Sequence, residues 1–352
     1  MKIAYIVPSL VQEGLVTVPY DLVIEMCNHG HQCEVFYFED RFPMFDFPCK
    51  TTKISFGDSI DFDDFDVIHS HGLRPDMYVT IHKKKKCKAM CVTTSHNFVF
   101  ADLISDHGYI KGILGGICWI MSWIRFDKIV VLTNTALEYY KRYVSLKKMS
   151  VVYNTRAVRV VQDIDVSDKA MFDDIKGKGC GIIGSVCRVT DRKGLEDIVK
   201  AMPLLDNFRY IIVGDGSSLP KLKALAVHLG VEDKIQFIGS RKNGNRYIPY
   251  FDVVCMPSRS EGFPLVLLES ALFKKSVVSS DIPVYKEVFD DSEIIACNTK
   301  DPEIIASAIQ RAFAERKMRG ERIYNKYMRC YSTEIFYKNY LKVYESGTNR
   351  NK

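Results

Sequence analysis

The sequence predicts an α/β protein with two doubly wound parallel sheets, one in each half of the chain. Short apolar runs rich in β-forming residues alternate with segments that carry apolar residues at helical spacing. The runs are apolar on both faces, which is typical of strands that helices cover on either side. The alternation stops in a polar, acidic stretch after residue 157 and restarts near residue 179, and 352 residues suffice for two separate cores.

The first half contains six expected strands, and the residues that follow them are candidates for ligand binding. We predict a helix over residues 18–29 and strands at 2–7, 33–38, 66–71, 88–95, 128–132 and 150–154. Ligands of a doubly wound sheet bind beyond the carboxyl ends of its strands. Gly14, His71, His96 and Thr133 lie at such positions, with Gly14 in a polar loop.

The second half repeats the pattern. We predict strands at residues 180–186, 209–213, 234–238, 253–256 and 276–279, and helices at 195–205, 220–229, 265–273 and 301–315. A last helix at 333–345 could pack on the second sheet or return to the first. The expected organisation is a first domain at 1–157, a linker at 158–178, a second domain at 179–325 and a C-terminal helical segment at 326–352.

Composition and charge exclude several classes of protein. The eleven cysteines show no paired spacing, and the N-terminus runs directly into a strand without a secretory signal, so we expect a reducing, cytoplasmic location. The most apolar window, residues 113–124, falls well short of the roughly 20 residues that span a bilayer, and we predict a buried helix there. A net charge of +6 without a basic, aromatic platform argues against nucleic-acid binding.

One dense basic run follows the apolar segment 77–81. It consists of Lys83, Lys84, Lys85, Lys86 and Lys88. Two interpretations remain open. The run is either the solvated end of a helix, favoured there by the helix dipole, or a contact with anionic phospholipid head groups at the inner face of the cell membrane.

The most informative stretch is residues 258–269, in which a strand, a loop and a helix meet. We expect Glu261 in the loop, a helix that begins near Pro264 or Leu265, and Glu269 about a turn and a half inside it. The free N–H groups of the first helical turn favour an anion.

Two cations provide a stronger phosphate site. Arg188 and Lys193 lie in the loop after the first strand of the second domain, and Gly194 opens the next helix. Arg and Lys beside a helix N-terminus suit a diphosphate. The Gly214-Asp-Gly216 segment predicts a tight turn, which either brings backbone close to a ligand or closes the loop.

Three other motifs carry no function in our interpretation. The glycines at 179, 181 and 184 fit the dinucleotide fingerprint, but they lie before and inside a strand, so we reject a dehydrogenase. The Asp-x-Asp pairs at 61–66 precede a strand and are expected in a solvated loop. We expect His69 and His71 on opposite faces of their strand, unable to share a metal, and we assign no metal site.

Taken together, these motifs resemble glycosyltransferase family 4, whose members are retaining enzymes with the GT-B fold. The resemblance rests on Arg188 with Lys193-Gly194, on Val213-Gly-Asp-Gly216, on the Glu-x7-Glu segment from Glu261 to Glu269, and on Asp281-Ile-Pro283 with Glu287-Val288. It covers the whole chain and is strongest from Gly184 to Val288. It implies two Rossmann-like domains that face a central cleft, with a nucleotide-sugar as donor.

The resemblance also implies roles for individual residues. Glu269 is expected to accept hydrogen bonds from the donor's ribose, and Glu261 to lie near the donor sugar. Arg188 and Lys193 would stabilise the charge on the leaving diphosphate, and His96 would reach the transferred sugar. The backbone around the donor is expected to come from Gly14, Gly214, Gly262, Phe263, Pro264, Leu265 and Val266. The chain departs from the family at Glu13-Gly14, where two glycines are common, and at Asn154-Thr155, where Gly often follows Asn.

The implied reaction is the transfer of a hexose or N-acetylhexosamine, expected from a UDP-sugar, to a glycan or lipid-linked glycan acceptor of bacterial surface polysaccharide, such as capsule or O-antigen. It needs neither metal nor cofactor. Two alternatives remain open: a nucleotide-sugar epimerase of similar fold, which consumes donor without forming a glycan, and a non-catalytic subunit that binds the donor and does not turn it over.

Overall fold

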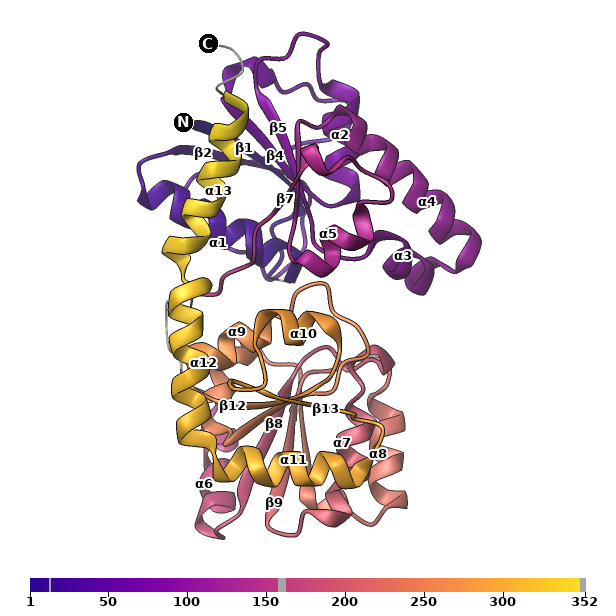
Figure 1. Ribbon diagram of the computed structural model, residues 1–352, viewed down its shortest axis with the longest axis vertical. Coiled ribbons are helices and arrows are strands. Elements are labelled where there is room, and N and C mark those ends of the chain that lie inside the picture. The colour runs from indigo at the N-terminus through magenta and orange to yellow at the C-terminus, as the bar shows by residue number, and fades with distance from the viewer. Residues whose placement is uncertain (13, 158–162, 349–352) are drawn as a thin grey trace. The chain divides into compact units, whose positions relative to one another are not determined.

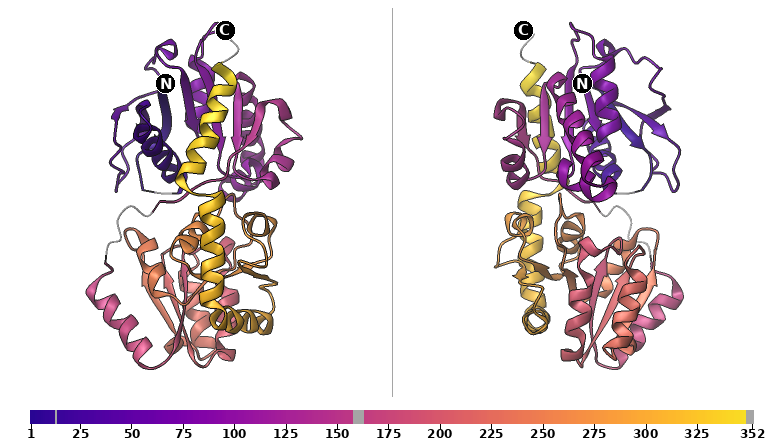
Figure 2. Two further views of the ribbon diagram at one scale, coloured as in Figure 1. Left: turned by 60° about the vertical axis from the view of Figure 1, so that its left-hand side comes forward. Right: turned by 90° about the vertical axis from the view of Figure 1, so that its right-hand side faces the viewer.

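The computed structural model describes residues 1–12, 14–157 and 163–348. The chain forms two compact units. Unit 1 contains Met1–Arg156 together with the chain from Tyr331 onward, and unit 2 contains Ala157–Cys330 (Figures 1 and 2). Each unit has a parallel sheet with helices packed against it, as the sequence predicts.

The sheet of unit 1 has seven parallel strands in the order β3-β2-β1-β4-β5-β6-β7. The direction of winding reverses between β1 and β4, as in Rossmann-like folds. The strands are β1 Lys2–Ser9, β2 Gln32–Glu39, β3 Lys50–Lys53, β4 Val67–His71, β5 Met90–Ser95, β6 Lys128–Val131 and β7 Met149–Val151.

The helices of unit 1 include one from the far end of the chain. They are α1 Gly14–Asn28, α2 Leu73–His82, α3 Val99–His107, α4 Tyr109–Ser122, α5 Asn134–Tyr140 and α13 Thr333–Thr348. Helix α13 packs on α1 and on β5. It buries Tyr340 and Tyr344, whose hydroxyls contact Thr94 and His69 of the sheet. The C-terminal helix therefore returns to the first sheet, one of the two arrangements that the sequence left open.

The sheet of unit 2 has six parallel strands in the order β10-β9-β8-β11-β12-β13, and its winding reverses between β8 and β11. The strands are β8 Gly181–Val186, β9 Phe208–Val213, β10 Ile235–Gly239, β11 Val253–Met256, β12 Ser276–Ser280 and β13 Ile295–Cys297. The helices are α6 Val166–Gly177, α7 Leu195–Ala201, α8 Leu219–His228, α9 Leu265–Leu272, α10 Pro283–Val288, α11 Pro302–Ala314 and α12 Arg316–Cys330.

Several local expectations need correction. Helix α1 begins at Gly14, so this residue is the first of a helix and does not lie in a loop. The expected linker contains a helix, α6, while residues 158–162 lie outside the described part of the chain. The window 113–124 is helical, but the prediction that it is buried is wrong, because Leu114, Met121 and Ile124 are at least 60% exposed.

Candidate active site

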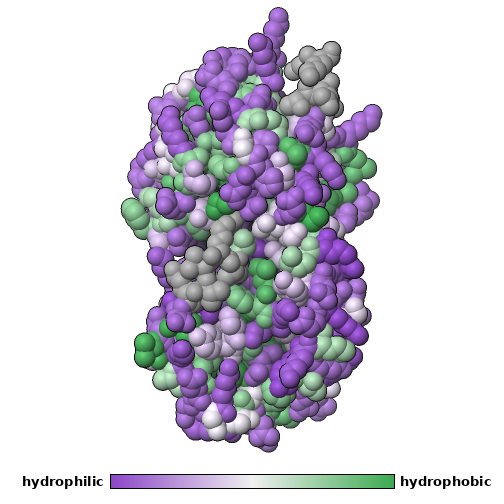
Figure 3. Space-filling model, turned by 90° about the vertical axis from the view of Figure 1, so that its left-hand side faces the viewer, coloured by the Kyte–Doolittle hydropathy of each residue, from purple (hydrophilic) through white to green (hydrophobic). Residues whose placement is uncertain are grey.

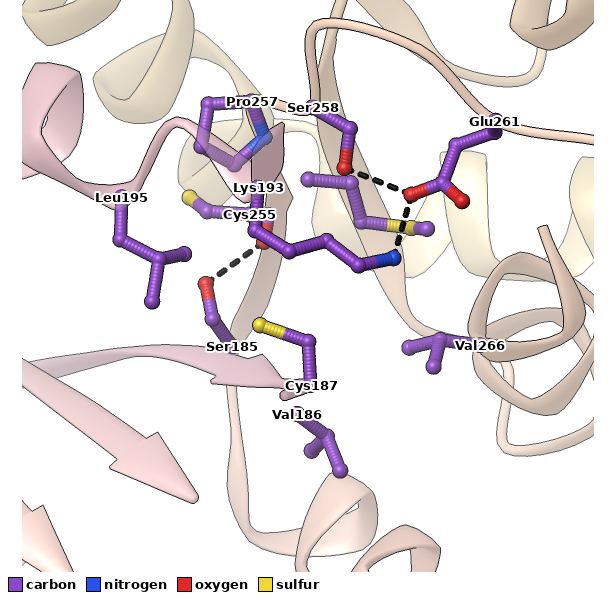
Figure 4. Close-up of a pocket in the computed structure, with 11 residues that line it drawn as sticks. Ser185, Val186, Cys187, Lys193, Leu195, Cys255, Pro257, Ser258, Glu261 and Val266 are labelled. Atoms are coloured by element: carbon purple, nitrogen blue, oxygen red, sulfur yellow. Dashed lines mark hydrogen bonds and ion pairs between the residues drawn. The ribbon is translucent and has the colours of Figure 1, made fainter. Parts of the chain in front are cut away.

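A pocket opens at the carboxyl ends of β8 and β11, where the winding of the unit 2 sheet reverses (Figure 4). Strands on either side of such a point send their connections in opposite directions, which leaves a crevice between them. The lining residues are Ser185, Val186, Cys187, Lys193, Leu195, Cys255, Met256, Pro257, Ser258, Glu261 and Val266.

The polar centre of this pocket is an ion pair between Lys193 and Glu261. Lys193 Nζ lies 2.6 Å from Glu261 Oε1, and Ser258 Oγ donates to the same oxygen over 2.7 Å (Figure 4). The second oxygen, Oε2, has Arg192 at 3.7 Å. Glu261 is buried, so pairing with a cation is what keeps its charge tolerable there. The carboxylate thus fixes Lys193 through one oxygen and keeps hydrogen-bonding capacity on the other.

The two loops that carry Lys193 and Glu261 pack closely against each other. Gly194 has φ +65°, and a Cβ at this position would lie 2.2 Å from the carbonyl oxygen of Pro257. Across the same contact, Arg259 N–H donates to the Arg192 carbonyl over 2.7 Å. The Arg259 side chain donates to Asp197 and Glu196, which hold the pKa of its guanidinium above the usual value. A side chain at 194 would have to displace the Pro257 carbonyl, which belongs to the loop that carries Glu261.

Arg188 lies on the loop after β8, but its side chain is exposed and does not line the pocket. Within the described residues it has no hydrogen-bond or ion-pair partner. Its loop is held by the turn at Gly214 and Gly216, where a Cβ would lie 1.8 Å from the Cys187 carbonyl oxygen and 2.2 Å from that of Val189. The glycine turn therefore closes against the Arg188 loop, and the expected place of Gly214 beside the donor stays a prediction.

Helix α9 begins at Leu265, as predicted, and it places Glu269 one turn inside. Val266 lines the pocket, whereas Phe263 and Glu269 are buried. The expected donor-binding segment is therefore a loop and first helical turn beside the pocket. Among the residues that sequence reasoning missed, Cys187 lines the pocket with a thiol whose pKa burial raises to about 11, and Ser258 and Arg192 hold Glu261. Arg192 directly precedes Lys193 in the sequence, and this second cation beside a predicted site residue could have identified it as a candidate.

In unit 1, His96 follows β5 and forms a hydrogen bond with His71, with 2.9 Å between His96 Nε2 and His71 Nδ1. The expectation that His69 and His71 point to opposite faces is wrong. Their ring centroids lie 4.2 Å apart, because residues two apart in a strand share a face. Burial lowers the pKa of His69 to about 3 and that of His96 to about 4. His96 is therefore a neutral hydrogen-bonding group at neutral pH.

Two further residues from the sequence analysis, Thr133 and Thr155, have structural partners in unit 1. Thr133 caps α5 by accepting from the Ala136 N–H over 2.9 Å. Thr155, at one departure from the family, donates to the Tyr331 carbonyl over 2.6 Å. A Cβ added at Gly14 would have no atom within 4 Å, so no neighbour in unit 1 requires Gly there, and Glu13 lies outside the described residues.

No metal-binding group emerges from the part of the chain that the structure describes. His69 hydrogen-bonds to Tyr344 and Thr94 through its two ring nitrogens, at 2.7 and 2.8 Å, which leaves neither for a metal. Asp61 and Asp63 are exposed in a 3-10 turn, as predicted, and Asp61 pairs with Lys84 at 2.9 Å.

Comparison with known proteins matches both halves of the chain. The family described as Glycosyltransferase Family 4 matches residues 13–156, and the family Glycosyl transferases group 1 matches residues 167–329. O-antigen biosynthesis glycosyltransferase WclY of Escherichia coli is 30% identical over 366 aligned residues, which cover 98% of each chain. A Campylobacter jejuni α-1,4-N-acetylgalactosaminyltransferase is 25% identical over 66% of this chain and 64% of its own. Its acceptor is an undecaprenol-linked glycan.

Solved structures with the same fold cover nearly the whole length of the chain. The Anabaena protein Alr3699/HepE, solved with UDP and glucose, aligns with a TM-score of 0.79 at 14% identity, over 98% of this chain and 100% of its own. Sucrose-phosphate synthase from Thermosynechococcus elongatus aligns with a TM-score of 0.80 at 16% identity, over 98% of each chain.

Proposed function

The chain belongs to glycosyltransferase family 4 and has the GT-B fold, and we propose that it transfers a hexose or N-acetylhexosamine from a UDP-sugar to a glycan of bacterial surface polysaccharide. The observation that carries the proposal is the Lys193–Glu261 pair in the pocket between β8 and β11. A fixed ammonium group at this edge of the sheet suits the diphosphate of a nucleotide-sugar. The relatives that act in O-antigen and undecaprenol-linked glycan synthesis support a glycan acceptor.

The proposed reaction retains the configuration of the anomeric carbon. The bond from this carbon to the phosphate oxygen breaks, and the bond to the acceptor oxygen forms on the same face. The acceptor's proton passes to the departing phosphate oxygen. Lys193 and Arg188 stabilise the negative charge that develops on the diphosphate, so neither a metal nor a cofactor is required. In this scheme, Glu261 binds a sugar hydroxyl through Oε2 and His96 contacts the transferred sugar.

A thermal-shift screen against UDP-, GDP- and ADP-sugars tests the donor. A ligand that binds only the folded protein raises the melting temperature, and we expect the largest rise with a UDP-sugar. UDP is the first choice because it occupies the Anabaena protein of the same fold. The product made from the best donor should keep the donor's anomeric configuration, which tests retention. The reaction should also proceed with EDTA present, which tests whether a metal is needed. Donor consumption without glycan would favour the epimerase, and binding without turnover would favour the non-catalytic subunit.

Glu269→Ala should weaken UDP binding by roughly 10- to 150-fold while turnover at saturating donor changes little. A carboxylate that accepts hydrogen bonds from both ribose hydroxyls contributes about 1.5–3 kcal/mol, and the ribose does not change during the reaction. Isothermal titration with UDP measures the loss. Glu303→Ala, on the exposed side of α11, is the matched control, and melting without ligand separates a folding defect from lost binding. Unchanged affinity in Glu269→Ala would remove this residue from the donor site.

A further inference from the structure

Helix α4 and the 3-10 turn Trp123–Arg125 that continues it present large apolar side chains to solvent. Ile110, Leu114, Ile117, Met121 and Ile124 are between 45% and 74% exposed, and we call them the α4 stripe. Their spacing of four, three, four and three residues places them along one side of a helix. In Figure 1, α3 and α4 project from one side of unit 1. Elsewhere, the face in Figure 3 carries mainly hydrophilic side chains, with hydrophobic ones in small groups.

The opposite side of α4 carries two glycines that pack against α3. A Cβ on Gly112 would lie 2.5 Å from the backbone of Ile104, and one on Gly116 would lie 2.4 Å from the Phe100 ring. These glycines let α3 approach closely. Trp119 faces inward too, and its Nε1 donates to buried Asp76 over 2.7 Å. The helix is thus fixed by its glycine and Trp side, and the exposure of its isoleucine, leucine and methionine side chains is built into the packing.

Basic side chains gather where the stripe ends. Arg125 donates to the Lys83 carbonyl, and Lys148 Nζ donates to the carbonyls of Ile124 and Phe126 over 2.8 and 2.9 Å. Lys85 and Lys86 are exposed in the turn after Lys83 and have no ion-pair partner within the described residues. Helix α4 itself has one charged residue, Lys111, and no acidic one. We call Lys85, Lys86, Arg125 and Lys148 the basic cluster.

We propose that the α4 stripe and the basic cluster form a docking surface for a lipid bilayer that contains anionic phospholipids. The stripe inserts among the head groups, with the helix parallel to the membrane plane. The exposed Lys85 and Lys86 pair with lipid phosphates, and Arg125 and Lys148 add positive charge beside them. The surface is separate from the donor pocket and does not depend on the proposed donor. Of the lysine run singled out in the sequence, only a part contributes to this surface. Lys83 forms an ion pair with Asp127 at 2.8 Å, and Lys84 forms one with Asp61.

The charges favour a lipid surface over a second copy of this chain. A second copy that paired through its own α4 would bring no acidic residue of that helix to the basic cluster. Anionic head groups supply the balancing negative charge. Among the described helices none is long and apolar enough to cross a membrane.

Co-sedimentation of the full chain with vesicles tests the proposal. We expect binding to phosphatidylcholine vesicles that contain phosphatidylglycerol, and much weaker binding to phosphatidylcholine alone. A variant with Leu114→Gln, Ile117→Gln and Met121→Gln should lose at least about tenfold in vesicle affinity. A second variant, Lys85→Gln with Lys86→Gln, should lose several-fold on the anionic vesicles only, and added salt should reduce the difference.

The matched control carries Leu204→Gln, Val227→Gln and Met328→Gln, three exposed apolar residues of unit 2, and it should bind vesicles like the wild type. All variants should show the wild-type melting shift with UDP, which separates this proposal from the proposed function. Equal vesicle binding by the stripe variant and the wild type would overturn the proposal. So would a wild-type dimer in sedimentation velocity that the stripe variant abolishes while neither protein binds vesicles.

Discussion

Replacing Lys193 with Ala should lower turnover by roughly 30- to 900-fold, which corresponds to about 2–4 kcal/mol of lost transition-state stabilisation. The ammonium group lies in the pocket at 2.6 Å from Glu261 and is already oriented before the donor binds. A preoriented charge does most of its work when negative charge builds on the leaving diphosphate, so the loss should appear in kcat more than in KM. Arg188→Ala should also lower turnover, although the exposed Arg188 side chain is not held in place before the donor binds.

The two variants should differ in stability. Lys193→Ala leaves the buried Glu261 carboxylate with Ser258 and a more distant Arg192, so its melting temperature should fall. Arg188 is exposed and makes no hydrogen bond or ion pair among the described residues, so its removal should leave melting unchanged. Lys221→Ala is the control, because Lys221 is an exposed lysine of the same unit that pairs with exposed Asp191 at 3.4 Å.

Steady-state kinetics with the donor identified by the melting screen measures these losses. A double-mutant cycle with Glu261→Gln then separates the two roles of Glu261. If it acts only by positioning Lys193, the double variant should be no worse than Lys193→Ala. An additional loss in the double variant would assign Glu261 its own contact with the donor sugar. Wild-type kcat in Lys193→Ala would disprove the charge-stabilisation mechanism.

The sequence was sufficient for most strands of both sheets and for the start of α9, because these rest on apolar runs and on local signals such as Pro264. It did not predict the Lys193–Glu261 pair, which joins residues 68 apart. That contact depends on β8 and β11 being neighbours, and the order of strands is a property of the whole sheet. A local sequence pattern therefore cannot predict this contact.

Two of the missed elements lack an apolar signal. Strand β3 has the sequence Lys-Thr-Thr-Lys at the sheet edge, and α12 is rich in Arg and Lys. Helix α4 is the reverse case, with ample apolar periodicity that gives no indication of which side faces the protein. The decisive residues are Gly112 and Gly116, which pack against α3 and turn the apolar side outward. Apolar spacing identifies a helix, whereas its burial depends on what its other side can approach.

Asp76→Ala should destabilise unit 1 by about 3–5 kcal/mol, the second large effect that we predict. Asp76, in the first turn of α2, is fully buried. Its Oδ1 accepts from the Ser70 and Thr93 hydroxyls over 2.6 and 2.8 Å, and its Oδ2 accepts from the indole N–H groups of Trp119 and Trp123 over 2.7 and 2.8 Å. Ala would remove the acceptor of both indole N–H groups, of which Trp123 is fully buried and Trp119 partly buried. The two indoles cannot replace it by pairing with each other, because each can only donate.

Asp76→Asn is the matched control, because its amide can satisfy the same four partners. The carbonyl oxygen can accept from both indoles, and the NH₂ group can donate to the two hydroxyls, which rotate to accept. Burial raises the pKa of Asp76 to about 6, although its four hydrogen bonds lower the pKa. A neutral amide avoids the cost of burying a charge at neutral pH, so Asp76→Asn should be at least as stable as the wild type at pH 7.

The pH dependence gives a sharper test, because its sign is fixed by the direction of the shift. The folded state holds the Asp76 proton more tightly than the unfolded state does, so protonation stabilises the protein below pH 4 and that contribution is lost as pH rises through about 6. Relative to Asp76→Asn, the wild type should therefore gain up to about 3 kcal/mol between pH 7 and pH 4. Urea unfolding of both proteins across this range measures the difference. A constant difference would show that the carboxyl group titrates alike in both states, and equal stability of Asp76→Ala would show that the indole donors find other partners.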